Sequence, residues 1–391
     1  PYKDRQTRAL TQGKRGWKCE WREEDGGNRL TLFIPQNSFV VTVRNKKKYD
    51  VCMSSRRPIR GVPLNVRHWN FAGLCLTDWC NASCRCCYMG CSPQRGHWMD
   101  EDTAVEIWRQ LQSASPHGCK IHLSGGEIFG DWPRLISLVR RAKAEGLVRL
   151  EKVETNGFWL ADEDEACRRI EALGEAGMEF LAISADPFHQ HYVPLEQVRR
   201  LAELGRKTLG PTRVQVRWEE WMENGEDLTA VTPEHRNAVF AKWLTRGYER
   251  INGRAAEELA GLMERKPIDT FRESICRKSL LRGKHIHVNP DGTLTPGVCA
   301  GILLGSWGSG EESSIAANWQ RLKDEYDSRP IVSTLATGGP VALAEQAAER
   351  GFVIDPRGYV SKCHLCWSLR KWLFAKGLGG EELGPAWLYG I

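Results

Sequence analysis

Five of the chain's 14 cysteines fall within the twelve positions from residue 80 to residue 91. Three of them, Cys80, Cys84 and Cys87, have the spacing C-x3-C-x2-C. Three thiolates from one tight loop can bind three irons of a cubane 4Fe-4S cluster and leave the fourth iron without a protein ligand. An open metal position is typical of chemistry rather than of scaffolding. The spacing therefore predicts an iron–sulfur site with an open coordination position.

The same loop allows other interpretations. Cys86 directly precedes Cys87, so a C-x-C register offers an alternative ligand set. A closed structural zinc knuckle is a second alternative. Cys91 has no assigned ligand role and is a candidate redox or radical participant. The remaining solitary cysteines are predicted to be small buried hydrophobic residues; they are Cys19, Cys52, Cys75, Cys119 and Cys167.

A second cysteine group lies in the C-terminal third and comprises Cys276, Cys299, Cys363 and Cys366. Two segments there are alike, "HVNPDGTLTPGVC" and "VIDPRGYVSKC". Each has an apolar run, a turn sequence and a strand-like stretch, which predicts a β-hairpin that ends at a cysteine. Four thiols predict a second metal site, but tetrathiolate spacing does not distinguish zinc from iron and sulfur.

The elements that must position these residues follow a repeated pattern. Apolar runs alternate with helix-period segments of the kind "DEDTAVEIWRQLQSA", which predicts a parallel sheet covered by helices. The runs are residues 71–77, 120–124, 149–155, 179–184, 213–218 and, less clearly, 248–253. Six such units would form an open, partial barrel. Before them, "RLTLFI" and "SFVVTVR" predict a small β element within residues 29–65.

Polar side chains follow the predicted strands at their carboxyl ends, where ligand sites lie in parallel sheets. They are Ser124, Gly125, Gly126 and Glu127 after the second run, Glu154 and Asn156 at the third, Ser184, Asp186 and His189 at the fourth, and Arg217 on the fifth. These groups should converge with the cysteine loop at the carboxyl-terminal edge of the sheet. His285 and His287 alternate with Ile286 on a predicted strand and so share one face of the C-terminal hairpin.

The cysteine loop after the first strand, together with "SGGE" after the second, resembles the radical S-adenosylmethionine (SAM) superfamily over roughly residues 70–255. The resemblance implies a partial (β/α)6 barrel. It also implies that SAM chelates the open iron through its amino and carboxylate groups. An electron from the cluster then cleaves SAM to a 5'-deoxyadenosyl radical, which abstracts hydrogen from a substrate.

The resemblance also implies roles for single residues. Glu127 would accept from the SAM ammonium, with the backbone of Gly125 and Gly126 close to the methionine moiety. Glu154 and Asn156 would contact the methionine carboxylate or ribose. Tyr88 and Ser184 complete the predicted SAM site. The chain departs from the family at Cys86, where an aromatic residue is usual. Catalytic residues stay unassigned; the candidates are Asp186, His189, Arg217 and Cys91.

The second cysteine group resembles the auxiliary-cluster extensions of radical SAM enzymes, of the twitch or SPASM type. Gly358 and Cys363 have the G-x4-C spacing of those extensions. Too few cysteines remain for two auxiliary clusters, so we predict one 4Fe-4S cluster at Cys276, Cys299, Cys363 and Cys366. Its expected role is to take up or relay electrons, or to brace the substrate site, and zinc remains the alternative metal.

These features predict three domains: a basic N-terminal arm with a small β element at residues 1–68, the partial barrel at 69–258 and the auxiliary-cluster domain at 259–391. Residues 1–70 carry sixteen Lys and Arg against six Asp and Glu, although the whole chain has a net charge of only +6. This basic excess is either a solvated arm or a docking surface for an acidic partner. The absence of a long apolar run or a secretory leader predicts a cytoplasmic protein without a membrane span.

The expected function is hydrogen abstraction from a peptide or protein, with a flavodoxin- or ferredoxin-type electron donor. The first alternative is the same chemistry on a small metabolite or lipid headgroup. A second is RNA modification, which the modest charge and the lack of a recognisable RNA-binding module disfavour. The third is a non-catalytic metal-binding scaffold.

Overall fold

The computed structural model describes residues 66–390 except Val148 and Val298, together with the backbone of three earlier strands. The chain divides into two compact units, residues 1–62 and residues 63–391. The first unit contains an antiparallel sheet in the order β1-β2-β3, formed by Lys18–Glu24, Gly27–Ile34 and Asn37–Thr42. The side chains of residues 1–65, including the basic arm, Cys19 and Cys52, lie outside the described residues.

The second unit is built on an eight-stranded sheet in the order β11-β10-β9-β4-β5-β6-β7-β8. Its strands are β4 (Phe71–Cys75), β5 (Lys120–Ser124), β6 (Leu150–Thr155), β7 (Phe180–Ile183), β8 (Val214–Val216), β9 (His285–Val288), β10 (Thr293–Thr295) and β11 (Gly305–Ser306). All neighbouring pairs from β9 to β8 are parallel, whereas β10 and β11 are antiparallel. This mixed α/β fold with a parallel core confirms the predicted partial-barrel class.

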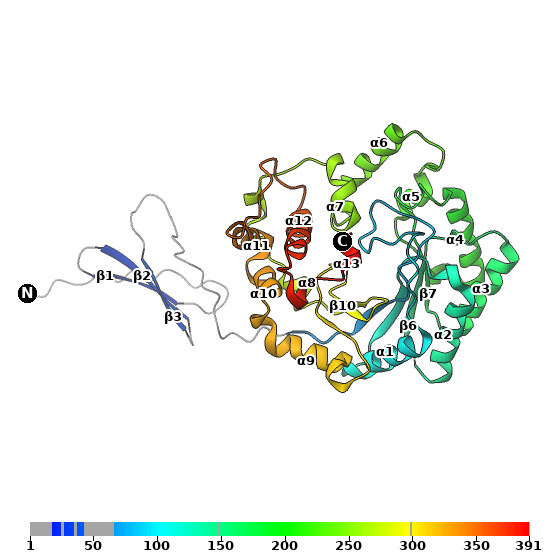
Figure 1. The fold of residues 1–391 in the computed structure, drawn as a ribbon, viewed down its shortest axis with the longest axis horizontal. Coiled ribbons are helices and arrows are strands. Elements are labelled where there is room, and N and C mark those ends of the chain that lie inside the picture. The colour runs from blue at the N-terminus through cyan, green and yellow to red at the C-terminus, as the bar shows by residue number, and fades with distance from the viewer. Residues whose placement is uncertain are drawn as a thin grey trace, which may run out of the picture. The chain divides into compact units, whose positions relative to one another are not determined.

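Helices connect the parallel strands and lie along the outer side of the sheet (Figure 1). They are α1 (Glu101–Ala114), α2 (Trp132–Ala144), α3 (Glu163–Glu175) and α4 (Leu195–Leu209), as the helix-period segments predict. Their starts are encoded locally: the Asp100 carboxylate accepts from the Thr103 amide at 2.9 Å, and Asp162 caps α3 in the same way. Each helix therefore begins where the sequence places an acidic N-cap or, for α4, a proline.

The prediction of a sixth strand at residues 248–253 is wrong. That segment forms no strand because Gly253 adopts a left-handed backbone with φ of +57°, which turns the chain toward the cysteine loop. A Cβ at Gly253 would lie 2.7 Å from the Cα of Tyr88. The sixth parallel strand is instead β9, which pairs with β4 at the other edge.

The C-terminal part is mostly helical. Its helices are α5 (Glu219–Asn224), α6 (Pro233–Leu244), α7 (Arg254–Glu258), α8 (Arg277–Leu280), α9 (Ile315–Glu325), α10 (Pro330–Thr337), α11 (Gly339–Ala348), α12 (Lys362–Ala375) and α13 (Ala386–Tyr389). The first predicted hairpin exists, since β9 and β10 are antiparallel and precede Cys299. The second does not. Ser361 caps α12 by accepting from the His364 amide at 3.2 Å, so Cys363 and Cys366 lie on a helix.

Strand β5 has an apolar outer face and a polar inner face. In β5, Ile121 and Leu123 are completely buried in the hydrophobic core, whereas His122 and Ser124 line a cavity. This alternation follows from the period of two along a strand. Cys75 and Cys119 are also completely buried, as predicted, whereas Cys167 on α3 is half-buried. In the part of the chain that the structure describes, no helix is long and apolar enough to cross a membrane.

Candidate active site

A cavity of about 620 Å³ lies at the carboxyl ends of the parallel strands. The predicted site residues that line it are Cys80, Cys84, Cys87, Tyr88, Cys91, Gly125, Gly126, Glu127, Glu154, Asn156, Ser184, His189 and Arg217. The fold therefore brings together the cysteine loop and the loops after β5, β6, β7 and β8. Asp186 does not line the cavity; it is completely buried behind it.

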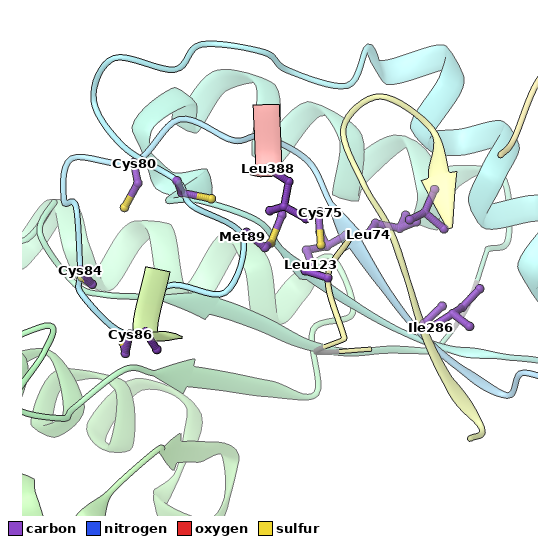
Figure 2. Close-up of a cluster of buried hydrophobic side chains, with 14 of the residues drawn as sticks. Leu74, Cys75, Cys80, Cys84, Cys86, Met89, Leu123, Ile286 and Leu388 are labelled. Carbon is purple, nitrogen blue, oxygen red and sulfur yellow. The ribbon is translucent and has the colours of Figure 1, made fainter. Parts of the chain in front are cut away.

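The cysteine loop is compact and largely buried. The amide of Cys87 donates to the carbonyl of Cys84 at 3.0 Å, which closes a turn between these two cysteines. Cys80 and Cys84 are only 8% and 4% exposed, and Figure 2 shows them on the same loop as Cys86 and Met89. Burial raises the pKa of the Cys80 thiol to about 12 and that of Cys84 well above its ordinary value. Metal binding here would therefore release protons.

Cys91 is the hydrogen-bond partner of Cys87. The Cys91 thiol lowers the pKa of Cys87 through this bond, and the same bond raises the pKa of Cys91 itself. Cys87 is thus the group in the loop with the strongest thiolate character, and Cys91 is placed to orient it. This contact gives Cys91 a local role that its spacing did not predict.

Arg254, at the start of α7, binds the cysteine loop at three points. Its guanidinium donates to the carbonyls of Cys84 and Cys91, each at 2.9 Å, and its amide donates to the carbonyl of Cys87 at 3.2 Å. Its positive charge favours the thiolate forms of Cys80, Cys84 and Cys87. For Cys80 and Cys84 it opposes the rise in pKa that burial causes. No sequence signal predicted this residue, because it lies about 170 positions from the loop that it holds.

The loop after β5 packs directly on the backbone of the cysteine loop. A Cβ at Gly126 would lie 1.7 Å from the Trp79 carbonyl oxygen, and one at Gly125 would lie 2.5 Å from that of Thr77. The amides of Gly126 and Glu127 donate to these same carbonyls at 2.7 and 2.8 Å. Both glycines are therefore required for the close approach of the two loops.

The carboxylate of Glu127 is almost completely buried, at 1% exposure. Its oxygens accept from the Asn156 amide at 2.6 Å, the Thr155 hydroxyl at 2.9 Å and the Phe129 amide at 3.2 Å. Burial outweighs these donors and raises its pKa to about 7. Three of its four acceptor positions are used within the protein, so it has capacity for about one further donor.

Asn156 connects the loop after β6 to the cysteines. Its amide nitrogen donates to Asn81 Oδ1 at 2.8 Å and lies 3.7 Å from Cys80 Sγ. Its side-chain oxygen accepts from the Phe158 amide at 3.0 Å, which fixes the orientation of the amide group. Asn156 therefore contacts the sulfur site itself.

Glu154 lies at the centre of a polar group on the inner barrel face. It accepts from the Ser124 hydroxyl at 2.7 Å and pairs with Lys152 at 2.7 Å, and His122 Nδ1 is 3.2 Å from its carboxylate. Burial opposes its ionisation, but His122 and Lys152 outweigh burial and hold the pKa of Glu154 well below its usual range. It is therefore an anionic group in the cavity.

The candidates after β7 and after β8 form a second charged group. Asp186 accepts from His189 Nδ1 at 2.7 Å and lies 3.6 Å from Arg217, which also pairs with Glu249. Burial opposes the charge on Asp186, but His189 and Arg217 outweigh it and hold its pKa at about 2. Arg217 thus has two carboxylate partners within the protein. Cys86 points toward this group, since its sulfur lies within 4.8 Å of ligand atoms of Asp186 and His189.

The second cysteine group is also gathered in space. Burial raises the pKa of Cys276 to about 12, and negative charge on Cys366, Cys299 and Cys363 contributes to the rise. Arg370 Nε donates to Cys366 Sγ at 3.4 Å. Arg250, which lines the cavity, lies with its guanidinium 3.9 Å from Cys299 Sγ. The four thiols therefore influence one another electrostatically, and Arg250 contacts both Cys299 and the cavity.

The donor set fits a cluster with an open iron. Thiols are the ligands of iron–sulfur clusters, and Cys80, Cys84 and Cys87 all reach the cavity from one short loop. Cys86 is the nearest alternative ligand in sequence, but it faces the carboxylate and imidazole of Asp186 and His189. The arrangement defines a cavity in which a metal cofactor and an anionic or cationic small molecule could bind side by side.

Comparison with known proteins identifies the class. Residues 74–234 match the family model of the Radical SAM superfamily. No curated protein matches the chain. Among solved structures, BtrN in complex with AdoMet and 2-DOIA is 15% identical, with a TM-score of 0.41 over 70% of this chain and 90% of that one. Native anSMEcpe with bound AdoMet and a Cp18Cys peptide is 13% identical, with a TM-score of 0.39 over 78% of this chain and 96% of that one.

Residues 74–234 are therefore assigned as a radical SAM domain, and this match supports an enzyme. The domain implies SAM and a 4Fe-4S cluster as cofactors, and an electron donor and a substrate as partners.

Proposed function

We propose that the protein abstracts hydrogen from a peptide or protein substrate, with the radical cluster bound by Cys80, Cys84 and Cys87. When bound, the cluster and SAM supply a 5'-deoxyadenosyl radical. The observation that carries the ligand assignment is the convergence of these thiols with the loop of Gly125, Gly126 and Glu127 on one cavity.

The chain's own residues would prepare this cavity. Arg254 holds three carbonyls of the cysteine loop, and Cys91 hydrogen-bonds Cys87. The free acceptor capacity of Glu127 suits the ammonium group of SAM. Asn156 keeps its amide beside Cys80, where it would donate to a metal-bound sulfur and stabilise its charge.

We also propose that Cys276, Cys299, Cys363 and Cys366 bind one auxiliary 4Fe-4S cluster in a twitch- or SPASM-like domain. The support is the mutual electrostatic influence of the four thiols and their position beside Arg250, which lines the cavity. A cluster there could take up the electron left after hydrogen abstraction. We propose the domain boundaries 1–68, 69–258 and 259–391 because each of the two cysteine groups then lies within one domain; β9 of the third domain adds a strand to the sheet of the second.

A peptide or protein is the proposed substrate because residues 1–70 carry sixteen basic and six acidic side chains. Such a segment can attract an acidic leader or protein partner. A small metabolite is the second candidate, since Lys152, Glu154 and Arg217 give the cavity charged groups of both signs that could orient a compact polar molecule.

The first test is anaerobic reconstitution with iron and sulfide, followed by dithionite and SAM. The wild-type protein should release 5'-deoxyadenosine and bind about eight iron atoms, as two 4Fe-4S clusters require. Cys84→Ala should lose SAM cleavage, because only two of the three proposed ligands remain. Cys167→Ala, at a half-buried cysteine of α3, is the matched control and should keep both properties.

Two outcomes would contradict the ligand assignment. Retained cleavage in Cys84→Ala would mean that Cys86 substitutes or that the ligand set is wrong. Absence of 5'-deoxyadenosine, with zinc retained and little iron taken up by the wild-type protein, would mean that the loop is a structural knuckle.

The auxiliary cluster is tested separately by Cys363→Ala. This variant should bind about four fewer iron atoms than the wild type and still cleave SAM, because the proposed radical cluster is intact. An unchanged iron content would argue against Cys363 as a ligand, and zinc at this group in the wild type would favour the alternative metal.

A further inference from the structure

Three histidines meet on the inner face of the barrel, apart from both cysteine groups. His122 lies on β5, and His285 and His287 lie on β9. One ring nitrogen of each lies within 4.8 Å of those of the other two. All three line the cavity, although His122 and His287 are only 3% exposed as whole residues.

Gly73 on β4 makes this meeting possible. It is the register partner of His122 on one neighbouring strand and of His287 on the other. A Cβ at Gly73 would lie 2.5 Å from His122 Nε2 and 2.5 Å from His287 Cδ2. The missing side chain therefore leaves the space into which imidazoles from both flanking strands turn.

The outer nitrogens of two rings face oxygen atoms. His122 Nδ1 lies 3.2 Å from the Glu154 carboxylate, and His287 Nδ1 lies 3.3 Å from the Tyr88 hydroxyl. Metal-bound histidines commonly have this arrangement, in which an oxygen partner on the second nitrogen fixes the ring orientation. It leaves Nε2 of both rings directed to the shared space.

The Nε2 atoms that face the shared space do not all have hydrogen-bond partners among themselves. His122 Nε2 and His285 Nε2 lie 2.9 Å apart, where one can donate to the other. His287 Nε2 is buried and has no hydrogen-bond partner among the described residues. Leaving such an atom unsatisfied costs free energy, and a metal ion that accepts the lone pairs of three neutral imidazoles would remove this cost. Burial, together with His122, lowers the pKa of His285 to about 3, so this ring is neutral.

We propose that His122, His285 and His287 form a binding site for a divalent transition-metal ion, with zinc as the test ion. Three imidazoles with an open side match the ligand number of catalytic zinc sites, in which a fourth position takes water or substrate. Here the open side faces the cavity, so the ion could hold an oxygen or nitrogen donor of the substrate. This inference goes beyond the proposed function and does not depend on the iron–sulfur ligands.

Zinc content and zinc X-ray absorption test the site in the cluster-reconstituted protein after incubation with Zn²⁺ and gel filtration. We expect about one zinc per chain, surrounded by nitrogen and oxygen at about 2.0 Å. His287→Ala should weaken zinc binding at least tenfold, because it removes one of three ligands. His117→Ala, at an exposed histidine outside the cavity, should bind zinc like the wild type.

Two results would overturn the proposal. One is wild-type protein that retains no more zinc than His287→Ala. The other is absorption dominated by sulfur at about 2.3 Å, which would place the ion at cysteines. The absorption measurement uses the wild-type protein, so it decides the question even if His287→Ala folds poorly. Release of 5'-deoxyadenosine from the same samples reports separately on the radical cluster.

Discussion

At the scale of single residues, the cysteine loop depends on a residue that is not a metal ligand. Arg254 donates to the carbonyls of Cys84 and Cys91 and is 17% exposed at its side chain. Hydrogen bonds from a charged donor each contribute about 1.5–3 kcal/mol. The loop would therefore lose much of its order without this side chain.

We expect Arg254→Ala to lower the free energy of unfolding by about 3 kcal/mol and to reduce iron bound after reconstitution by about half. Denaturant unfolding and iron analysis measure the two effects. Arg168→Ala removes an exposed arginine of α3 that, among the described residues, pairs only with Glu165, and it should change neither quantity. Normal iron binding by Arg254→Ala would show that the loop holds its shape without the guanidinium.

A pH-dependent contribution to stability comes from His189. Burial alone would lower its pKa, but Asp186 outweighs burial and raises it above the ordinary value. The His189–Asp186 ion pair is fully formed below about pH 6.5, the usual histidine pKa. Its contribution to stability is lost as pH rises through the raised pKa of His189. At the acid end it is lost as pH falls toward the Asp186 pKa of about 2.

His189→Ala should therefore destabilise the cluster-free protein by about 2 kcal/mol at pH 5.5 and by clearly less at pH 9. Urea unfolding at the two pH values measures the difference, with His117→Ala as a control that shows none. An equal loss at both pH values would mean that His189 contributes through packing and not through its charge.

At the scale of elements, the site depends on the contact between the loop after β4 and the loop after β5. Gly126 lies against the Trp79 carbonyl, where a Cβ would be only 1.7 Å away. The neighbour is backbone, so it cannot move aside as a flexible side chain would. The two loops can approach only while this position has no side chain.

Gly126→Ala should lower the free energy of unfolding by about 3 kcal/mol or more, at the upper end of overpacking effects, and impair iron binding. Gly261→Ala is the control, because a Cβ there meets no atom within 4 Å. Thermal unfolding and iron content of the two variants measure the effect. Equal behaviour of the variants would contradict the close packing of the two loops.

At the scale of the whole molecule, the second unit contains the entire candidate site. Residues 63–391 form a compact unit of their own. All predicted metal ligands and SAM contacts lie within it, whereas the excess of basic over acidic side chains lies in residues 1–62. Catalysis and substrate docking are therefore separable by truncation.

A variant of residues 63–391 should release 5'-deoxyadenosine at the wild-type rate and bind an acidic test peptide at least tenfold more weakly than the full chain. Fluorescence anisotropy with a labelled peptide measures the binding. Equal affinity in both proteins would remove the docking role of the arm. Steeply salt-dependent binding of RNA by the full chain would instead favour the nucleic-acid alternative.

The sequence alone determined the features that are encoded within short stretches. The alternation of apolar runs with helices predicted the class of fold. The spacing of Cys80, Cys84 and Cys87 and the polar residues at the strand ends predicted one shared site. These signals depend on local periodicity and ligand spacing, which a single strand or loop carries completely. The errors at residues 248–253 and 353–361 also arose locally, from strand-like composition in segments that turn or precede a helix cap.

Only the tertiary structure decided which distant side chains meet. Arg254 contacts Cys84 across 170 positions, and His122 contacts His285 across 163. Neither contact leaves a periodic trace in the sequence, because each depends on which strands become neighbours and which backbone lacks a side chain. The pairing of β9 with β4 over Gly73 is the clearest case: the order of strands in the sheet, and not any motif, brings the three histidines together.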